Sequence, residues 1–482
     1  AVNLILTDGS HLTTEWGINV KEGDTFTVYA QSTDENTMGK LTACLSEEEP
    51  TSDIKYYVWP DRGMTGIGSS VRYRKHNSGL IESDGDIIIN GGNIRARGQA
   101  GAACIGGSSG DNVTWSYESD IRQCGSVTIN GGIVRTEAAK RYDAFYNNGI
   151  GSVLGYGGSV TINGGTVVAE ARADAIATGR NGSITINGGN ITARGGLGEG
   201  SPIGLGAGSG IGSDDVINNI TINGGNIDAY SARDGLGIGS AGTATVKITD
   251  GVIKAVSNAE AAIGLCQYGT GSVSITGGKV TARGGNYGAG IGGGAYGNGS
   301  DITVTGGEVT ANSGNYGAGI GGGGWGNGNN ISISGGKVTA TGGTFAAGIG
   351  GGMHRDGNDI TISGGEVSAA GGRCGAGIGG GLDARGSGDV TVSGDAKLKV
   401  RGGKTGDDGQ GAGIGNGGVR DQNGPVNGTE VEPDICALNP SGKIEYYAPG
   451  SVMTGTPSKT VTNPTGDFVW DSGTVTTPAT CT

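Results

Sequence analysis

A short motif centred on an isoleucine, AGIG, recurs at a constant interval in the second half of the chain. Its isoleucines are Ile291, Ile320, Ile349 and Ile378, and each follows the previous one by 29 residues. A second motif alternates with it, with sequences such as ITINGGNITA at 184–193 and ITISGGEVSA at 360–369. A constant period of about 20 to 50 residues is typical of solenoids, propellers and other repeat arrays.

The pattern within each repeat selects among these architectures. Apolar and polar residues alternate in runs such as ITI and VTA, which predicts strands of about three to five residues. No segment has a helical period or helix-capping residues, and a propeller blade needs four strands in about 40 residues. The sequence therefore predicts an all-β, single-stranded parallel β-helix of about 11–12 coils, right-handed as parallel connections generally are.

The regularity of the repeat predicts the organisation of the chain. We expect the β-helix to occupy residues 1–435, with irregular coils at about 46–260 and regular coils of about 29 residues at about 262–415. The Thr- and Pro-rich segment 436–482 is expected to be a C-terminal cap or linker. The glycines, 108 in all, then have structural roles: Asn and Gly of INGG supply positive φ at a bend, and those of AGIGGG let coils approach. Because no helix follows them, a phosphate-binding loop is excluded.

Charge and composition limit the partners. Acidic residues outnumber basic ones by 45 to 32, a net charge of -13, which disfavours nucleic acid and anionic membranes. No apolar run approaches the roughly 20 residues that insertion into a membrane requires. We expect a secreted or cell-surface protein whose signal peptide has been removed before Ala1. Disulfides are candidates between Cys104 and Cys124 and between Cys436 and Cys481.

Metals and cofactors have little support in the sequence. His11, His76 and His354 are scattered and have no metal-ligand spacing. We therefore expect no cofactor and no catalytic metal. Structural Ca²⁺ is compatible with the Asp- and Asn-rich turns, although no EF-hand loop occurs.

The sequence resembles the glycine-rich right-handed β-helix proteins that Gram-positive, Firmicutes-type bacteria secrete or display. The resemblance rests on the opening NLILTDGSHLTTEWGINVKEGDTFTVYAQS and on the GAGIGGG…ITISGGEVSA array, and it covers about residues 1–420. It implies an adhesin or a carbohydrate-directed module on a fold that also hosts glycoside hydrolases and lyases. No catalytic signature of those enzymes matches, so the resemblance transfers no site.

Two columns of aromatic residues follow from the repeat. Tyr287, Tyr316 and Phe345 each precede an AGIG isoleucine by four residues, and a second set follows it by five, namely Tyr268, Tyr296, Trp325 and His354. If stacked, each set forms a ladder with one ring per coil. We expect the second ladder to be a platform for sugar rings; the alternative is a turn stack that only stabilises the coils.

The irregular coils hold further candidates. The proposed ligand-binding side chains there are Trp115, Tyr117, Arg141, Tyr146, Arg172 and Arg233, and the carboxylates are Asp174, Asp234, Asp214 and Asp215. Carboxylates of adjacent coils would lie about 5 Å apart, a separation suited to acid–base or nucleophilic attack on a glycosidic bond. The alternative is a solvated Arg–Asp salt-bridge ladder.

Three functions are therefore open. The leading hypothesis is an extracellular β-helix that recognises polysaccharide or host glycan on one face. The second is a glycoside hydrolase, or less favoured a polysaccharide lyase, with its carboxylates on the irregular coils. The third is a non-catalytic spacer or adhesin stalk.

Overall fold

The computed structural model describes residues 1–43, 65–69, 83–98, 102–107, 123–137, 147–152, 155–197, 208–213, 218–240, 244–269, 271–384, 386, 388–404, 409–421 and 424–462. The chain divides into two compact units, Ala1–Ala241 and Gly242–Thr482. All the regular elements among these residues are strands. In both units the chain runs repeatedly through three parallel sheets, which confirms the predicted right-handed parallel β-helix.

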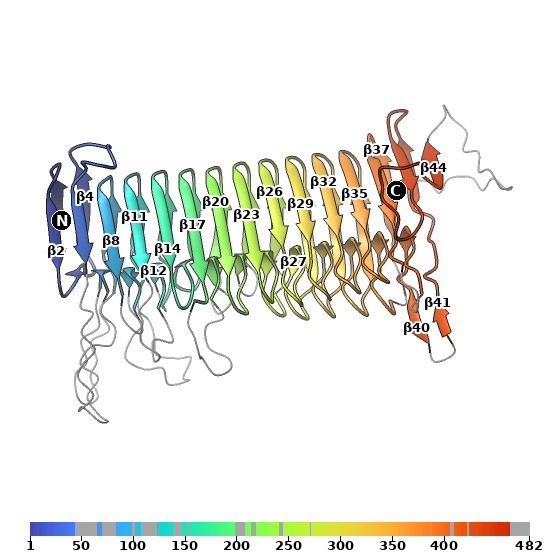
Figure 1. Ribbon diagram of the computed structural model, residues 1–482, viewed down its shortest axis with the longest axis horizontal. Coiled ribbons are helices and arrows are strands. Elements are labelled where there is room, and N and C mark those ends of the chain that lie inside the picture. Colours follow the sequence, from blue (N-terminus) through green and yellow to red (C-terminus); the bar gives the residue numbers. More distant parts are fainter. Residues whose placement is uncertain are drawn as a thin grey trace, which may run out of the picture. The chain divides into compact units, whose positions relative to one another are not determined.

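Unit 1 has three sheets whose strands lie side by side in chain order (Figure 1). Its first sheet contains β1 (Val2–Leu6), β4 (Thr25–Ala30), β7 (Asp86–Ile89), β10 (Ser126–Ile129), β13 (Ser159–Ile162), β16 (Gly182–Ile186) and β19 (Asn218–Ile222). Its second contains β2 (His11–Thr14), β5 (Lys40–Ala43), β8 (Asn93–Arg97), β11 (Ile133–Glu137), β14 (Thr166–Glu170), β17 (Asn190–Gly195) and β20 (Asn226–Ser231). Its third contains β3 (Ile18–Asn19), β6 (Ile67–Gly68), β9 (Ile105–Gly107), β12 (Ile150–Ser152), β15 (Ile176–Ala177), β18 (Ile211–Ser213) and β21 (Ile238–Ser240).

Unit 2 repeats this arrangement. Its first sheet contains β22 (Thr245–Ile248), β25 (Ser272–Ile275), β28 (Gly299–Val304), β31 (Gly328–Ile333), β34 (Gly357–Ile362), β37 (Val390–Gly394) and β42 (Asp434–Leu438). Its second contains β23 (Val252–Ser257), β26 (Lys279–Arg283), β29 (Glu308–Asn312), β32 (Lys337–Thr341), β35 (Glu366–Ala370), β38 (Lys397–Arg401), β43 (Lys443–Tyr446) and β44 (Lys459–Thr462). Its third contains β24 (Ile263–Leu265), β27 (Ile291–Gly293), β30 (Ile320–Gly321), β33 (Ile349–Gly350), β36 (Ile378–Gly379) and β39 (Ile414–Gly415), and β40 (Val419–Asp421) pairs with β41 (Gly424–Val426) as a hairpin.

The described strands make seven coils in unit 1 and six in unit 2, counted on the third sheet. The total exceeds the expected 11 or 12 because β1 to β5 lack the INGG turn. Identical positions pair in register, as Ile291 does with Ile320 and Ile320 with Ile349. These isoleucines are fully buried, so the core of each unit is a set of stacked apolar columns.

The glycines after the isoleucines let coils approach, as predicted. Gly292 has φ 134°, and a Cβ there would overlap the backbone carbonyl oxygen of Gly321 on the next coil. The prediction for INGG was only partly right. The second glycine takes the positive φ, for example 85° at Gly165, whereas Asn163 does not.

The asparagines of INGG have a different role in unit 1. The side-chain amide of Asn130 donates to Asn90 Oδ1 at 2.7 Å, and Asn163 donates in turn to Asn130 at 2.7 Å. Asn187 and Asn223 continue this ladder at 2.7 and 2.8 Å. Each asparagine therefore satisfies its neighbour's carbonyl at an exposed turn.

Residues 430–462, which we call the cap, contain the strands of a further coil and then an antiparallel strand. Strands β42 and β43 pair in parallel with β37 and β38, and β44 then pairs antiparallel with β43. The Glu430 carboxylate accepts the backbone N–H groups of Gly413 and Ile414, each at 2.9 Å. In the coil before, the matching N–H of Ile378 donates to the Gly413 carbonyl at 3.0 Å. Glu430 thus takes the place of the peptide groups of a following coil.

Two other expectations concern cysteines and membranes. Cys104 and Cys124 both carry thiols, so the disulfide expected between them is wrong. Cys104 instead donates to the backbone oxygen of Glu137 at 3.3 Å. The disulfide expected between Cys436 and Cys481 involves a residue outside the described ones. Within the described ranges there is no helix with the length and apolarity to cross a membrane.

Candidate functional site: an aromatic turn surface

The aromatic columns lie on two turns of unit 2, one before and one after each strand of the third sheet. The two turns contact each other through their backbones. Gly324 N–H donates to the Tyr287 carbonyl at 2.6 Å, Met353 N–H to that of Tyr316 at 2.9 Å, and Leu382 N–H to that of Phe345 at 2.8 Å. The paired turns therefore form one surface, which we call the aromatic turn surface.

A small apolar cluster lies between these turns. Met353, Cys374 and Leu382 are buried in it, and the rings of Tyr316, Trp325 and Phe345 pack against them. Glycine stands at 324 where the next two coils have Met353 and Leu382. A Cβ at Gly324 would come 2.9 Å from Tyr316 Cβ, so the missing side chain makes room for the rings.

The rings stack from coil to coil, in the register that the sequence predicts. In one column the ring centroids of Tyr268 and Tyr296 are 5.9 Å apart, and those of Tyr296 and Trp325 are 4.9 Å apart. In the other column Tyr287 and Tyr316 are separated by 5.3 Å, and Tyr316 and Phe345 by 5.7 Å. Trp325 joins the columns because its ring also lies 5.6 Å from Tyr316.

This geometry changes what the ladder can offer a ligand. The planes of Tyr296 and Trp325 are within 15° of each other, and those of Tyr287 and Tyr316 within 11°. Neighbouring rings therefore cover one another's faces, and the middle of the ladder presents mainly edges. Sequence reasoning had assumed open faces. Exposure is concentrated at one end, where Tyr268 is 70%, Tyr296 45% and Tyr287 38% exposed.

The backbone beneath the second column is strained. Tyr268, Tyr296, Trp325 and His354 have φ of 61°, 56°, 62° and 62°, in the left-handed region where bulky residues are rare. Each such residue costs on the order of 1 to 3 kcal/mol. Stacking offsets this cost by about 0.5 to 1.5 kcal/mol for each ring pair. Glycine would adopt these φ values without strain. The strain at these four positions therefore comes from having side chains there.

Polar groups border the rings. Asn315 donates its side-chain amide to Asn286 Oδ1 at 2.7 Å, and Thr344 Oγ1 donates to Asn315 Oδ1 at 2.9 Å. The Glu260 carboxylate accepts the backbone N–H of Ala295 at 2.6 Å, immediately before Tyr296. Hydrogen-bonding side chains therefore accompany the aromatic rings at successive coils.

His354 follows Trp325 in the second column and lies beside a carboxylate. Its Nδ1 lies 3.2 Å from Asp383 Oδ2, and Asp383 occupies the same column one coil later at φ 57°. The neighbouring Arg355 donates its Nε–H to the backbone oxygen of Trp325 at 2.9 Å. The ladder thus changes from aromatic to charged groups at this end.

Six segments of the chain match the β-helix repeat family. They cover residues 184–215, 220–242, 273–295, 302–324, 331–353 and 360–382. No curated protein and no solved structure matches the chain. Tyr287, Tyr316 and Phe345 lie within the matched segments of unit 2, whereas Tyr268, Tyr296, Trp325 and His354 lie between or just before them.

Of the carboxylates predicted for catalysis, the structure describes Asp174 and Asp234, and it does not bring these two together. Asp174 is buried and accepts the backbone N–H of Ser209 at 2.8 Å. Asp234 is exposed, stands four residues before its isoleucine rather than two, and belongs to a coil two steps away. Two steps correspond to roughly 10 Å at about 4.8 Å each. Asp174 therefore acts in the structure as a backbone acceptor.

The remaining predicted residues divide into two groups. Arg172 and Arg233 are half-buried in unit 1. The others lie outside the described residues, namely Trp115, Tyr117, Arg141, Tyr146, Asp214 and Asp215.

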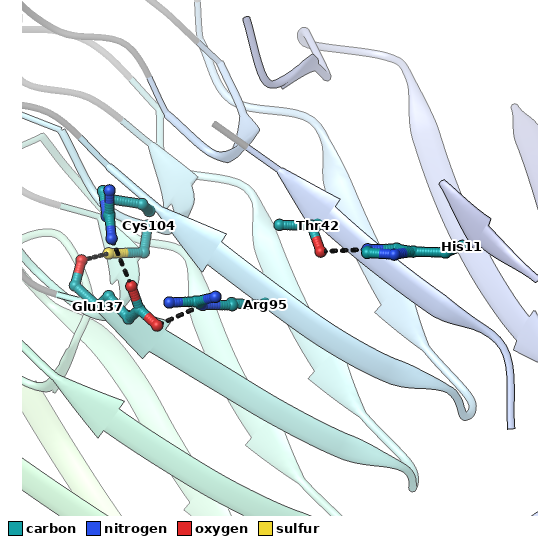
Figure 2. Close-up of polar contacts among 6 residues, drawn as sticks. His11, Thr42, Arg95, Cys104 and Glu137 are labelled. Carbon is teal, nitrogen blue, oxygen red and sulfur yellow. Dashed lines mark hydrogen bonds and ion pairs between the residues drawn. The ribbon is translucent and has the colours of Figure 1, made fainter. Parts of the chain in front are cut away.

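Ion pairs occur on the second sheet of unit 1. Glu137 pairs with Arg95 and, at 2.6 Å, with Arg97 (Figure 2). Burial alone would raise the pKa of Glu137, but the hydrogen bonds and charges of the two arginines outweigh it and lower the pKa. Figure 2 also shows His11 bonded to Thr42 Oγ1 at 2.8 Å. In the described parts no three His, Cys, Asp or Glu side chains are grouped to hold a metal ion.

Sequence reasoning missed Glu260. It stands three residues before Ile263, where the following β-helix repeats have Gly288, Gly317 and Ala346. A charged residue in a column of small ones was the available signal, and aligning the repeats by their isoleucines would have found it.

Proposed function

We propose that this chain is an extracellular, non-catalytic β-helix protein that binds polysaccharide or host glycan through the aromatic turn surface of unit 2. The observation that carries the proposal is the stack of rings held in strained backbone, with Tyr268, Tyr287 and Tyr296 exposed at one end. Tyrosine combines an apolar ring with a hydroxyl, which suits partners that are partly apolar and partly polar.

The chemistry of sugars matches this surface. A pyranose has C–H groups that pack against aromatic carbon and hydroxyl groups that need hydrogen-bonding partners. The amides of Asn286 and Asn315 and the carboxylate of Glu260 border the rings. Coils repeat about every 4.8 Å, a spacing similar to that of successive sugars in an extended polysaccharide.

Binding is favoured over hydrolysis by the state of the acids at this surface. Glycoside hydrolysis usually requires two carboxyl groups on either side of the scissile bond. Here Glu260 accepts a backbone N–H, Asp383 contacts His354, and Asp356 accepts the backbone N–H of Gly386 at 3.0 Å. These contacts give each acid a structural role, and they support recognition without turnover.

The test is binding to a panel of plant, microbial and mucin glycans, followed by calorimetry on those retained. We expect Tyr268→Ala and Tyr296→Ala each to weaken binding at least about tenfold, which is about 1.4 kcal/mol. Trp16→Ala is the matched control, because Trp16 is 71% exposed but lies in unit 1. Wild-type affinity in both tyrosine variants, or no retained glycan, contradicts the proposal.

A further inference from the structure

The first column of rings begins abruptly. Four residues before their isoleucines, successive coils carry Ala259, Tyr287, Tyr316 and Phe345. Tyr287 N–H donates to the Ala259 carbonyl at 2.9 Å, so Tyr287 lies directly on the coil that holds Ala259. One face of the Tyr287 ring is covered by Tyr316 at 5.3 Å. On its other side the column offers only a methyl group.

Other side chains belong to the turns near Ala259, where the first ring column begins. Tyr268 belongs to the same coil as Ala259, and its ring is 70% exposed while stacking on Tyr296. Glu260 follows Ala259, and both residues are half-buried. The Glu260 carboxylate reaches the next coil at Ala295, which places it between the turn that carries Tyr268 and the turn that carries Tyr296. We call this step, made of Ala259, Glu260, Tyr268 and Tyr287, the notch.

We propose that the notch holds the terminal sugar of a neutral glycan, so that the protein recognises chain ends. This rests on the proposed function and specifies its ligand. A pyranose occupies the position of the missing ring: its C–H face stacks on Tyr287, as Tyr316 does on the opposite side, and Tyr268 packs beside it. The Glu260 carboxylate, which lies beside Ala295, is the hydrogen-bond acceptor for the sugar hydroxyls.

The notch can be filled without disturbing the fold. Ala259→Tyr supplies at this column the residue that the next two coils already have, so the variant extends the ladder by one ring. We expect its melting temperature to equal or exceed that of the wild type and its affinity for glycan to fall at least about tenfold. Leu12→Tyr is the control, because it adds a tyrosine ring at an exposed position of unit 1, outside the aromatic turn surface, and we expect unchanged affinity.

The ligands are α-1,4- and β-1,4-linked glucose oligomers and N-acetylglucosamine oligomers, each from monosaccharide to hexasaccharide, titrated by calorimetry. Recognition of an end predicts that affinity stops rising after the disaccharide. Undiminished binding by Ala259→Tyr, or affinity that climbs with every added sugar, overturns the notch but leaves the proposed function standing, with the glycan lying along the ring edges. If the wild type binds none of these oligomers, the notch is refuted; the proposed function is then decided separately by the wider panel.

Discussion

Trp325 is the residue whose replacement most directly measures the balance between ring stacking and backbone strain. Its ring contacts Tyr296 at 4.9 Å, Tyr316 at 5.6 Å and Tyr287 at 6.0 Å. At about 0.5 to 1.5 kcal/mol for each pair, Trp325→Ala removes about 1.5 to 4.5 kcal/mol. The alanine keeps the φ of 62°, so the strain stays while the compensation is lost.

Trp325→Gly removes the same ring contacts, and it also removes the backbone strain at this position. Left-handed backbone costs a residue with a Cβ roughly 1 to 2 kcal/mol relative to glycine. We therefore expect the glycine variant to be more stable than the alanine variant by about 1 kcal/mol, the reverse of the usual order in regular structure.

The assay is urea denaturation of wild type and both variants, followed by the fluorescence of the remaining tryptophans and by circular dichroism. Because repeat proteins need not unfold in one step, the comparison uses the transition of unit 2, identified by hydrogen exchange in the regular coils. An alanine variant at least as stable as the glycine variant refutes the reasoning, since it would mean that the strained φ has no cost.

Three further predictions concern single residues. Burial raises the pKa of Glu430 in the folded protein despite its two backbone hydrogen bonds. The contribution of Glu430 to folding stability is therefore greatest below the pKa of an unfolded glutamate, and it is lost as pH rises through the pKa of the folded state. We expect the cap to lose protection from hydrogen exchange as pH rises in the wild type, and Glu430→Gln to abolish this pH dependence. The same pH dependence in the variant would show that Glu430 does not cause it. The pKa of Glu137 is lowered in the folded protein. Its contribution to folding stability is therefore present above the ordinary glutamate pKa and disappears as pH falls through the pKa of the folded state. Carbon-13 NMR titration of the Glu137 carboxyl checks this, and an ordinary or raised pKa contradicts it. Gly292→Ala should lower the free energy of unfolding of unit 2 by several kcal/mol, because the new Cβ meets the Gly321 carbonyl. Gly9→Ala is the control: Gly9 has φ 73° and no atom lies within 4 Å of the new Cβ, so this change should cost only about 1 to 2 kcal/mol. Equal losses of stability in thermal unfolding would show that contact between coils is not the reason for Gly292.

The fold was predictable because the pattern that specifies it is local and repeated. The spacing of Ile291, Ile320 and Ile349 fixes which residues stack, and period-two alternation fixes which side faces the core. The register of the rings followed from the same count. Their tilt did not, because the sequence offset gives a column and not the orientation of a side chain. That is why the covered ring faces came only from the structure.

Polar residues were harder to interpret than apolar ones. Asp174 was a candidate catalytic acid under the enzyme hypothesis, and in the structure its carboxylate accepts the backbone N–H of Ser209. Asn163 was expected to supply a positive φ, but the following Gly165 takes that role and frees the amide for a ladder. In both cases the same residue type fits two roles, and only the positions of neighbouring coils distinguish them.

The central claim is that a glycan contacts the exposed end of the aromatic turn surface. NMR spectra of the chain labelled with carbon-13 in its tyrosine rings test this claim directly, with resonances assigned by single Tyr→Phe variants and a bound oligosaccharide titrated in. The account predicts that the ring signals of Tyr268, Tyr287 and Tyr296 shift with a common dissociation constant. The signals of Tyr156 and Tyr446, which lie outside this surface, should stay in place. Binding that leaves the first three signals unmoved would contradict the account.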